Sequence, residues 1–308
     1  MSLPKALNPI VRQLPHAGEI FLDHIGHFVR SAERASEALI QAGFQVTPIS
    51  IQKNKGPDGT SRLTGTGNVT AMLKSGYIEI LFKTADTPLG QEFDEAITKQ
   101  PGVHLAAFAV SDAWAQSQRL KQSRFRVRPI VDLKRPIVTE GGESEAAFTV
   151  ARVERGEMAE GRIQYLTHHT EEAVWQKRWL SHPNTAEALL DIVIVVDDVK
   201  EAANRFGRFL DHEPVLGSLG VGFHLERGGV HLMDRNTFED MFGSAPQLPF
   251  IGIYAVRVAS LQTCETFLAR NDMKTERHKN LLLSRFPEPL GLGAWLFVEC
   301  ENDLPWRS

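Results

Sequence analysis

The 308-residue chain contains four copies of one short unit, and this internal repetition constrains the fold more than any other feature. Each copy opens with a short apolar strand that runs directly into a helix-like stretch. The first two copies also carry a histidine near the start of the strand, at His24 and at His104. Repeated units of this kind predict a duplicated architecture. The two histidines indicate where in that architecture a functional site is expected.

Within each copy the order of elements reads βαβββ. In the first copy a strand at 22–29 leads into a helix that ends at Gly43, since glycine commonly terminates helices. Further strands are expected near 44–47, 68–73 and 77–82. The other copies start with strands at 103–110, 190–196 and 250–256, and helical linkers are expected over 89–100 and 171–180. The turn at His182-Pro183-Asn184 is the expected boundary, giving two domains over residues 1–185 and 186–308.

Composition narrows the class of protein. A hydrophobic content of 42% in a chain of this length is enough for a large buried core. The net charge of −4 and the lack of a Lys/Arg-rich run argue against a nucleic-acid partner. Cys264 and Cys300 are too few for a disulfide framework. With no apolar run of signal-peptide or membrane-span length, we expect a cytoplasmic protein that does not bind membranes.

The modules resemble a known superfamily. Asp23-His24-Ile25 opens the first module and Ile78-Glu79-Ile80 closes it, as in the vicinal oxygen chelate superfamily of glyoxalase I, extradiol dioxygenases and fosfomycin- and bleomycin-resistance proteins. Gly65-Thr66-Gly67-Asn68 and Trp175 with His182-Pro183-Asn184 are similar to its glyoxalase-like branch. The resemblance implies an α+β fold in which four βαβββ modules pair into two cup-shaped mixed sheets with helices outside. The chemistry differs among proteins of one fold, so the fold alone does not define the reaction.

Strand alternation places candidate site residues on one face. Residues two apart on a strand share a face, so His24 should lie with Gly26 and Phe28, and Glu79 with Tyr77 and Leu81. The more apolar opposite faces should pack under the helices. His24 and Glu79 are therefore expected to face the cup.

The same parity in the second module places His104, Ala106 and Phe108 on the cup face, with Gln164 and His168 on the last strand. Two modules packed with pseudo-symmetry would bring His24, Glu79, His104 and Gln164 to one point. Two imidazoles, a carboxylate and an amide oxygen suit a divalent metal ion such as Zn, Ni, Mn or Fe(II). The resemblance assigns the superfamily's four ligand positions to the same four residues.

Gln164 departs from the glyoxalase I pattern, in which a glutamate is commoner at this position and works as the base. An amide cannot take up a proton near neutral pH, which argues against glyoxalase activity. His168 lies four residues further along the same face. Gln164 or His168 is therefore expected to complete or flank the site, as a ligand or a catalytic group.

In the second half the corresponding positions are Asp191, His231, Ile251 and Trp295, which cannot form such a metal site. We expect that half to be structural or to hold a filled apolar pocket. The leading hypothesis is a metal-dependent lyase, isomerase or dioxygenase acting on a small oxygenated metabolite, as a monomer or homodimer. The alternatives are a metal-free protein that sequesters a small molecule or antibiotic in the same cup, and a structural relative with no small ligand.

Overall fold

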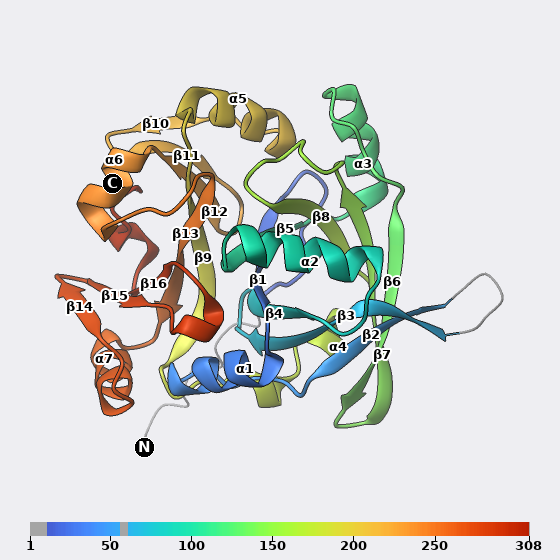
Figure 1. Cartoon of the computed structure of the whole chain (residues 1–308), viewed down its shortest axis with the longest axis horizontal. Helices are drawn as coiled ribbons and strands as arrows, with labels where there is room; N and C mark the ends of the chain where they lie inside the picture. The colour runs from blue at the N-terminus through green and yellow to red at the C-terminus, as the bar shows by residue number, and fades with distance from the viewer. Residues whose placement is uncertain (1–10, 56–60, 308) are drawn as a thin grey trace, which may run out of the picture.

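The structure is a computed structural model that describes the backbone of residues 11–55 and 61–307 and the side chains of residues 11–52 and 63–307. It contains four consecutive βαβββ modules, as the sequence predicts (Figure 1). The first two are β1 (Phe21–Val29), α1 (Ala32–Gln41), β2 (Ser50–Lys55), β3 (Ser61–Met72) and β4 (Tyr77–Lys83), then β5 (Gly102–Ala109), α3 (Ala113–Gln122), β6 (Val131–Thr139), β7 (Gly142–Arg152) and β8 (Arg162–His168).

The last two modules are β9 (Ala186–Val195), α5 (Val199–Leu210), β10 (Val215–Gly217), β11 (Gly220–His224) and β12 (Gly229–Met233), then β13 (Phe250–Val258), α7 (Leu261–Arg270), β14 (Thr275–His278), β15 (Leu281–Arg285) and β16 (Ala294–Val298). The connecting helices are α2 (Pro88–Lys99), α4 (Glu171–Val174), α6 (Arg235–Phe242) and the short 3-10 helices η1 (Lys177–Trp179), η2 (Glu288–Leu290) and η3 (Glu301–Asp303). The predicted linker helix over 89–100 is thus present as α2, whereas the predicted helix over 171–180 is split into α4 and η1.

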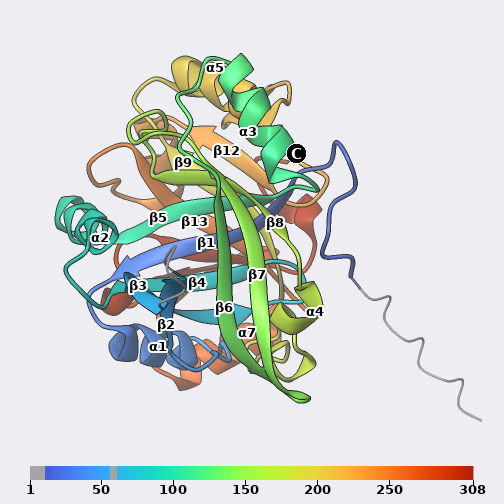
Figure 2. The ribbon, with the colours of Figure 1, turned by 90° about the vertical axis from the view of Figure 1, so that its right-hand side faces the viewer.

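The modules pair through their first strands. β1 runs antiparallel to β5, and within each module the first and last strands are parallel, as in β1–β4 and β5–β8. The first half therefore forms the strand order β2-β3-β4-β1-β5-β8-β7-β6, and the second forms β10-β11-β12-β9-β13-β16-β15-β14. The pairing of Ile251 in β13 with Val103 in β5 joins the two into a single mixed sheet that does not close, and isolated bridges such as Ser75 with Ala188 add to this junction. Figure 1 shows the two halves side by side, and Figure 2 shows β6 and β7 as a long curved pair.

One hydrophobic core runs through all four modules on the helix side of the strands. Helix α1 contributes Ala35 and Leu39 to it, and helix α5 contributes Phe206 and Phe209. These residues recur at helical spacing, so each helix presents one apolar stripe to the sheet. Because the same core includes residues of β1, β4, β9 and β13, the two halves bury their helix-facing sides together.

Two irregularities in the β1–β5 pairing decide which side chains face the cup. The register shifts between Leu22 and His24 and again between Gly26 and His27, so Asp23 in β1 and His104 in β5 are extra residues. Such bulges reverse the alternation on either side of them. Beyond His104 the cup face therefore carries Leu105 and Ala107. The expectation that Ala106 and Phe108 face the cup is wrong, because both lie in the helix-side core.

The cup of the second half is filled with apolar side chains. Phe238 and Phe242 of α6 and Leu304 and Trp306 near the C-terminus pack against β9, β13 and β16. Asp191 anchors this tail by accepting hydrogen bonds from Trp306 Nε1 at 2.8 Å and Arg307 Nη2 at 2.6 Å. Ile251 and Trp295, which we expected at cup positions, lie instead in the helix-side core.

Helix α2 covers the cup of the first half and lies across the front of the molecule in Figure 1. Thr87 caps it, since Thr87 Oγ1 accepts a hydrogen bond from Gly90 N at 3.1 Å and donates one to Thr64 O at 2.7 Å. We expect Thr87→Ala to lower the free energy of unfolding by about 1 kcal/mol, because the first turn then loses its cap. Urea denaturation of Thr87→Ala beside Thr87→Ser, which keeps the hydroxyl, measures this; equal losses in both variants would contradict it.

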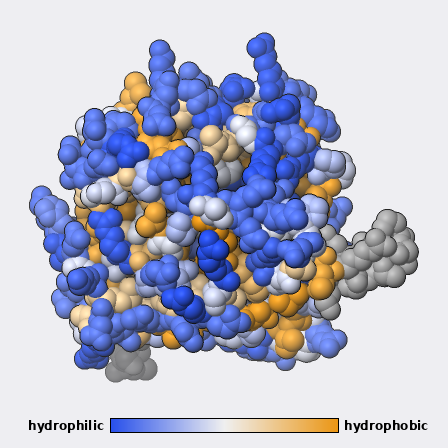
Figure 3. Space-filling view, in the orientation of Figure 1, coloured by the Kyte–Doolittle hydropathy of each residue, from blue (hydrophilic) through white to orange (hydrophobic). Residues whose placement is uncertain are grey.

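The surface offers no dominant apolar patch on the face seen in Figure 3, where hydrophobic residues are exposed in separate areas among hydrophilic ones. None of the helices in the described part of the chain is long and apolar enough to span a membrane.

Candidate functional site

A cavity of about 330 Å³ lies in the cup of the first half, between α2 and the strands of both modules. Its size falls at the lower end of the range of ~300–1,000 Å³ typical of small-molecule pockets. Three of the predicted site residues line it, namely His24 from β1, Glu79 from β4 and Gln164 from β8. The alternation along β4 and β8 is regular, and for this reason Glu79 and Gln164 were predicted on the correct face.

His24 is held from behind by a buried carboxylate. Its Nδ1 donates to Asp23 Oδ2 at 2.7 Å, and its ring stacks on Tyr77 with the centroids 4.3 Å apart. Asp23 is the bulged residue of β1, and each of its carboxylate oxygens contacts one histidine ring. His168 Nε2 lies 3.0 Å from the second oxygen, Asp23 Oδ1. Burial raises the pKa of Asp23, but electrostatic attraction and hydrogen bonds from the His168 and His24 rings outweigh it and hold this pKa well below its ordinary value.

His168, unlike His24, lies outside the cup cavity. Its side chain is fully buried, and it packs edge-on against Trp175 and Phe148. Arg227 of the second half reaches the same carboxylate, with Nη2 at 3.9 Å from Asp23 Oδ1. His168 and Arg227 support Asp23, which in turn orients His24 so that Nε2 faces the cavity.

Glu79 is the carboxylate nearest to that free nitrogen. Glu79 Oε2 lies 3.6 Å from His24 Nε2, while Oε1 accepts a hydrogen bond from Asn68 Nδ2 at 2.6 Å. Arg135 Nη1 approaches the same Oε1 at 3.6 Å. Glu79 is thus fixed on one side by an amide and a guanidinium, and turned on the other side toward the imidazole.

Four arginines make the wall of this cavity strongly cationic. Arg128, Arg135, Arg152 and Arg162 all line it, accompanied by Glu79 and Glu92. Glu92 is shared, because it accepts from Arg162 Nη2 at 2.9 Å and from Arg128 Nη1 at 3.4 Å. The described carboxylates therefore balance only part of the positive charge.

Arg152 is the least compensated of the four. Its one side-chain hydrogen bond to the described residues runs from Nε to Gln164 Oε1 at 3.1 Å, a neutral acceptor. Burial, with a smaller contribution from the neighbouring charges of Arg162 and Arg128, lowers the pKa of Arg152 to about 10. A buried charge is ordinarily paired, so a guanidinium left open toward a cavity indicates a site for an anion.

His104 lies apart from this group. As the bulged residue of β5 it is directed toward α2, where its Nε2 donates to Gln100 O at 2.5 Å, and it lines a different cavity from His24. The structure thus brings His24, Glu79 and Gln164 to one cavity and leaves His104 outside it.

The chemistry of the donors bears on whether a divalent metal ion fits. Within residues 11–55 and 61–307 no group of three or more His, Cys, Asp or Glu side chains is arranged to hold one. Gln164 Oε1 already accepts from Arg152, and Glu79 Oε1 from Asn68. Among the described side chains that line the cup, His24 Nε2 and Glu79 Oε2 remain as one pair of free ligand atoms, beside guanidinium groups that repel a cation. The described side chains therefore do not fit a metal held by four protein ligands.

The cavity also brings together arginines that the sequence analysis did not single out. Strand alternation contains the signal, since Arg162, Gln164 and Leu166 share one face of β8, and Arg152 pairs in register with Gln164. A search restricted to metal-binding residue types passes over them.

Comparison with known proteins identifies the family. Residues 22–210 match a glyoxalase-like domain, and no curated protein gives a significant match. Among solved structures, a hypothetical protein from Staphylococcus aureus is 10% identical with a TM-score of 0.62, covering 90% of this chain and 98% of that one. A mutant of 4-hydroxymandelate synthase from Streptomyces coelicolor is 11% identical with a TM-score of 0.55, covering 91% and 92%.

A Mn(II)-bound glyoxalase from Novosphingobium aromaticivorans is 12% identical with a TM-score of 0.49, covering 92% of this chain and 83% of that one. At these identities the likeness to the first two structures shows the fold alone. The family match spans more than half of the sequence and includes the whole first cup. The chain belongs to the glyoxalase-like family of the vicinal oxygen chelate superfamily.

Proposed function

We propose that the cup of the first half binds a small organic anion with a carbonyl next to its carboxylate, and that His24 transfers a proton on this ligand. The observation that carries the proposal is the position of His24 Nε2, which Asp23 turns into a cavity whose wall holds a buried arginine, Arg152, with no carboxylate partner in the described part of the chain. Small 2-oxo acids combine the negative charge that Arg152 requires with an acidic C–H bond.

Each residue that lines or supports the cup has its own role in this reaction. Arg152 and Arg135 bind the carboxylate and stabilise the negative charge that develops on the carbonyl oxygen when the neighbouring carbon loses a proton. His24 Nε2 takes up or returns that proton, and Asp23 keeps its ring in place. Gln164 acts as a positioning residue for Arg152 through the Nε hydrogen bond. His168 supports Asp23 from the far side.

The test follows hydrogen exchange at the carbon beside the carbonyl. In D₂O, proton NMR should show the C3 signal of 2-oxobutyrate disappearing faster with the protein than with buffer. We expect His24→Gln to slow this exchange by about 100-fold or more, which is a typical loss when a general acid–base group is removed. His278→Gln on the distant strand β14 is the matched control and should exchange as the wild type does.

Wild-type exchange at the buffer rate in protein that binds the oxo acid would refute the proton transfer. Equal exchange by His24→Gln and wild type would refute the role of His24.

A second candidate is the metal-dependent enzyme of the vicinal oxygen chelate type, with Zn, Ni, Mn or Fe(II). One observation favours it, because a histidine that binds metal usually donates its other ring N–H to a carboxylate, as His24 does to Asp23. Metal analysis of untagged protein purified without chelators separates the two. A stoichiometric metal that is lost in His24→Ala and Glu79→Ala, and retained in His104→Ala, would support this candidate.

We also propose a division between the halves. Residues 1–185 provide the ligand site, and residues 186–308, whose cup is packed with apolar side chains, support it through the shared core and through Arg227.

A further inference from the structure

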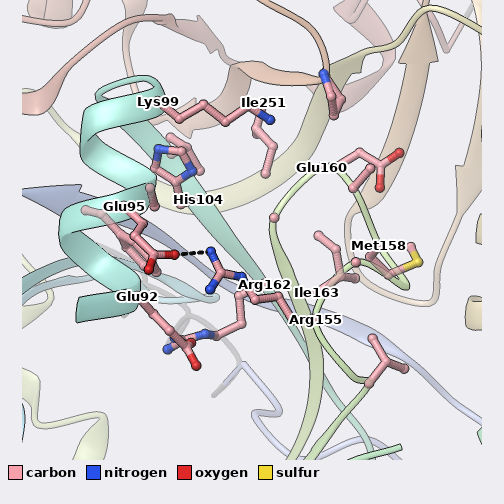
Figure 4. Close-up of a pocket in the computed structure, with 18 of the residues that line it drawn as sticks. Glu92, Glu95, Lys99, His104, Arg155, Met158, Glu160, Arg162, Ile163 and Ile251 are labelled. Carbon is pink, nitrogen blue, oxygen red and sulfur yellow. Dashed lines mark hydrogen bonds and ion pairs between the residues drawn. The ribbon is translucent and has the colours of Figure 1, made fainter. Parts of the chain in front are cut away.

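A second cavity of about 310 Å³ lies on the other side of the charged wall. It is bounded by α2, by the β7–β8 connection and by the start of β13, so both halves of the chain contribute to it. Figure 4 shows Glu95 and Lys99 of α2 on one side and Met158 and Glu160 of the connection on the other. Glu92, Arg128, Arg152 and Arg162 line both cavities and separate them.

The positive charges of this cavity exceed the carboxylates available to pair with them. Arg155 pairs with Glu95, Arg128 Nε lies 3.4 Å from Glu154 Oε2, and Glu160 is engaged by Arg205 at 2.7 Å from outside the cavity. Among the described residues Lys99 has no ion pair, and Arg152 has only its neutral partner Gln164. Two cations on the same cavity therefore lack a counter-charge.

The remaining wall is apolar. Val103, Ile163, Met158 and Ile251 line it, the last from the second half of the chain. A purely ionic ligand would leave this surface without contacts, whereas a compact apolar body would bury against it at about 25 cal/mol per Å².

His104 adds one directional group. Its Nε2 carries the proton that is donated to Gln100 O, and the ring is then an acceptor at Nδ1, which makes no hydrogen bond to the described residues. Burial lowers the pKa of His104, and together with the charge of Lys99 it outweighs the hydrogen bond to Gln100 O, which raises this pKa, so the neutral ring is favoured.

We propose that this cavity is a second ligand site, distinct from the cup, and that it binds a carboxylate attached to a compact apolar body. The carboxylate lies against Lys99 and Arg152, and the body packs on Met158, Ile163 and Ile251. Because Arg152 and Arg162 belong to both walls, a ligand here competes with the cup for the same guanidinium groups. The proposal goes beyond the activity of the cup and does not depend on proton transfer by His24.

The test uses benzoate and the methyl group of Met158, which lines this cavity and not the cup. The full-length chain is labelled with [methyl-¹³C]methionine, and Met158→Leu assigns its resonance among the six methionines. We expect benzoate to shift the Met158 resonance. The shift should saturate at a benzoate concentration of about 20 mM, which corresponds to a Kd in the millimolar range. Benzamide, the neutral isostere, should not shift it at the same concentration.

Variants locate the site. Ala96→Phe on α2 fills only this cavity and should abolish the shift. Lys99→Met should lower the affinity for benzoate at least about fivefold, because the carboxylate loses a charged partner. Leu133→Trp fills only the cup and should leave the shift of Met158 intact. Thermal melts check that each variant folds. If Ala96→Phe does not fold, Lys99→Met still tests the site, because Lys99 is exposed and its substitution does not disturb the core.

Several results would overturn the proposal. These are an unmoved Met158 resonance in the wild type, an equal response to benzamide, full affinity in Lys99→Met, or loss of the shift in Leu133→Trp. The last result would place benzoate in the cup and would leave the proposed function standing.

Discussion

Asp23→Ala is expected to lower the free energy of unfolding by about 3–5 kcal/mol, the range found when one partner of a buried ionic group is removed. Asp23 is fully buried and accepts from His24 and His168, with Arg227 at 3.9 Å. Without the carboxylate these groups are left buried and without their acceptor. Urea denaturation of wild type and variant measures the loss.

The control is Asp94→Ala on α2, which removes an exposed ion pair with Lys83 and should change stability by at most about 0.5 kcal/mol. The pH dependence of Asp23→Asn gives a second test. Because folding lowers the pKa of Asp23, its contribution is present above the ordinary carboxyl pKa of about 4 and is lost as the pH falls below it. The stability gap between wild type and Asp23→Asn should therefore narrow in acid. A gap that is constant from pH 7 to pH 3 would contradict this account.

Arg152→Met should separate binding from stability. The affinity of the cup for 2-oxobutyrate should fall at least about 30-fold, because loss of a desolvated charged partner typically costs about 2 kcal/mol or more. The ligand-free variant should be as stable as the wild type or up to about 2 kcal/mol more stable, since an uncompensated buried charge is replaced by an apolar chain of similar length.

Isothermal titration gives the affinity and urea denaturation gives the stability of the same preparations. Leu216→Met on the exposed strand β10 is a control that should change neither quantity. Unchanged affinity in Arg152→Met, together with a large loss of stability, would show that Arg152 is a structural residue.

Much of the fold follows from the sequence because the repeat is strong. Apolar strands followed by helices with one apolar stripe fix the βαβββ order, and the parity of β4 and β8 correctly places Glu79 and Gln164. The parity of β5 could not be predicted, because a bulge depends on how two strands pair and leaves no mark in the alternation of one strand. For this reason His104 was expected in the cup and lies beside α2.

The site was only partly predictable for a related reason. His24 and Glu79 carry a recognisable pattern, whereas the role of Arg152 depends on which carboxylates reach it in three dimensions. Sequence spacing shows that Glu92 lies on a helix, and only the folded chain shows that it is shared between Arg128 and Arg162. The excess of positive charge in the cup is therefore a property of the packing.

The central claim is that the cup of the first half holds a small organic anion on Arg152. A crystal structure of the wild-type protein soaked with 2-oxobutyrate tests it most directly. We predict density for the ligand inside the cup, with its carboxylate within hydrogen-bonding distance of Arg152 and its C3 carbon facing His24 Nε2. An empty cup in crystals that bind 2-oxobutyrate elsewhere would contradict the account. So would a metal ion between His24 and Glu79 that binds the ligand at a position away from Arg152.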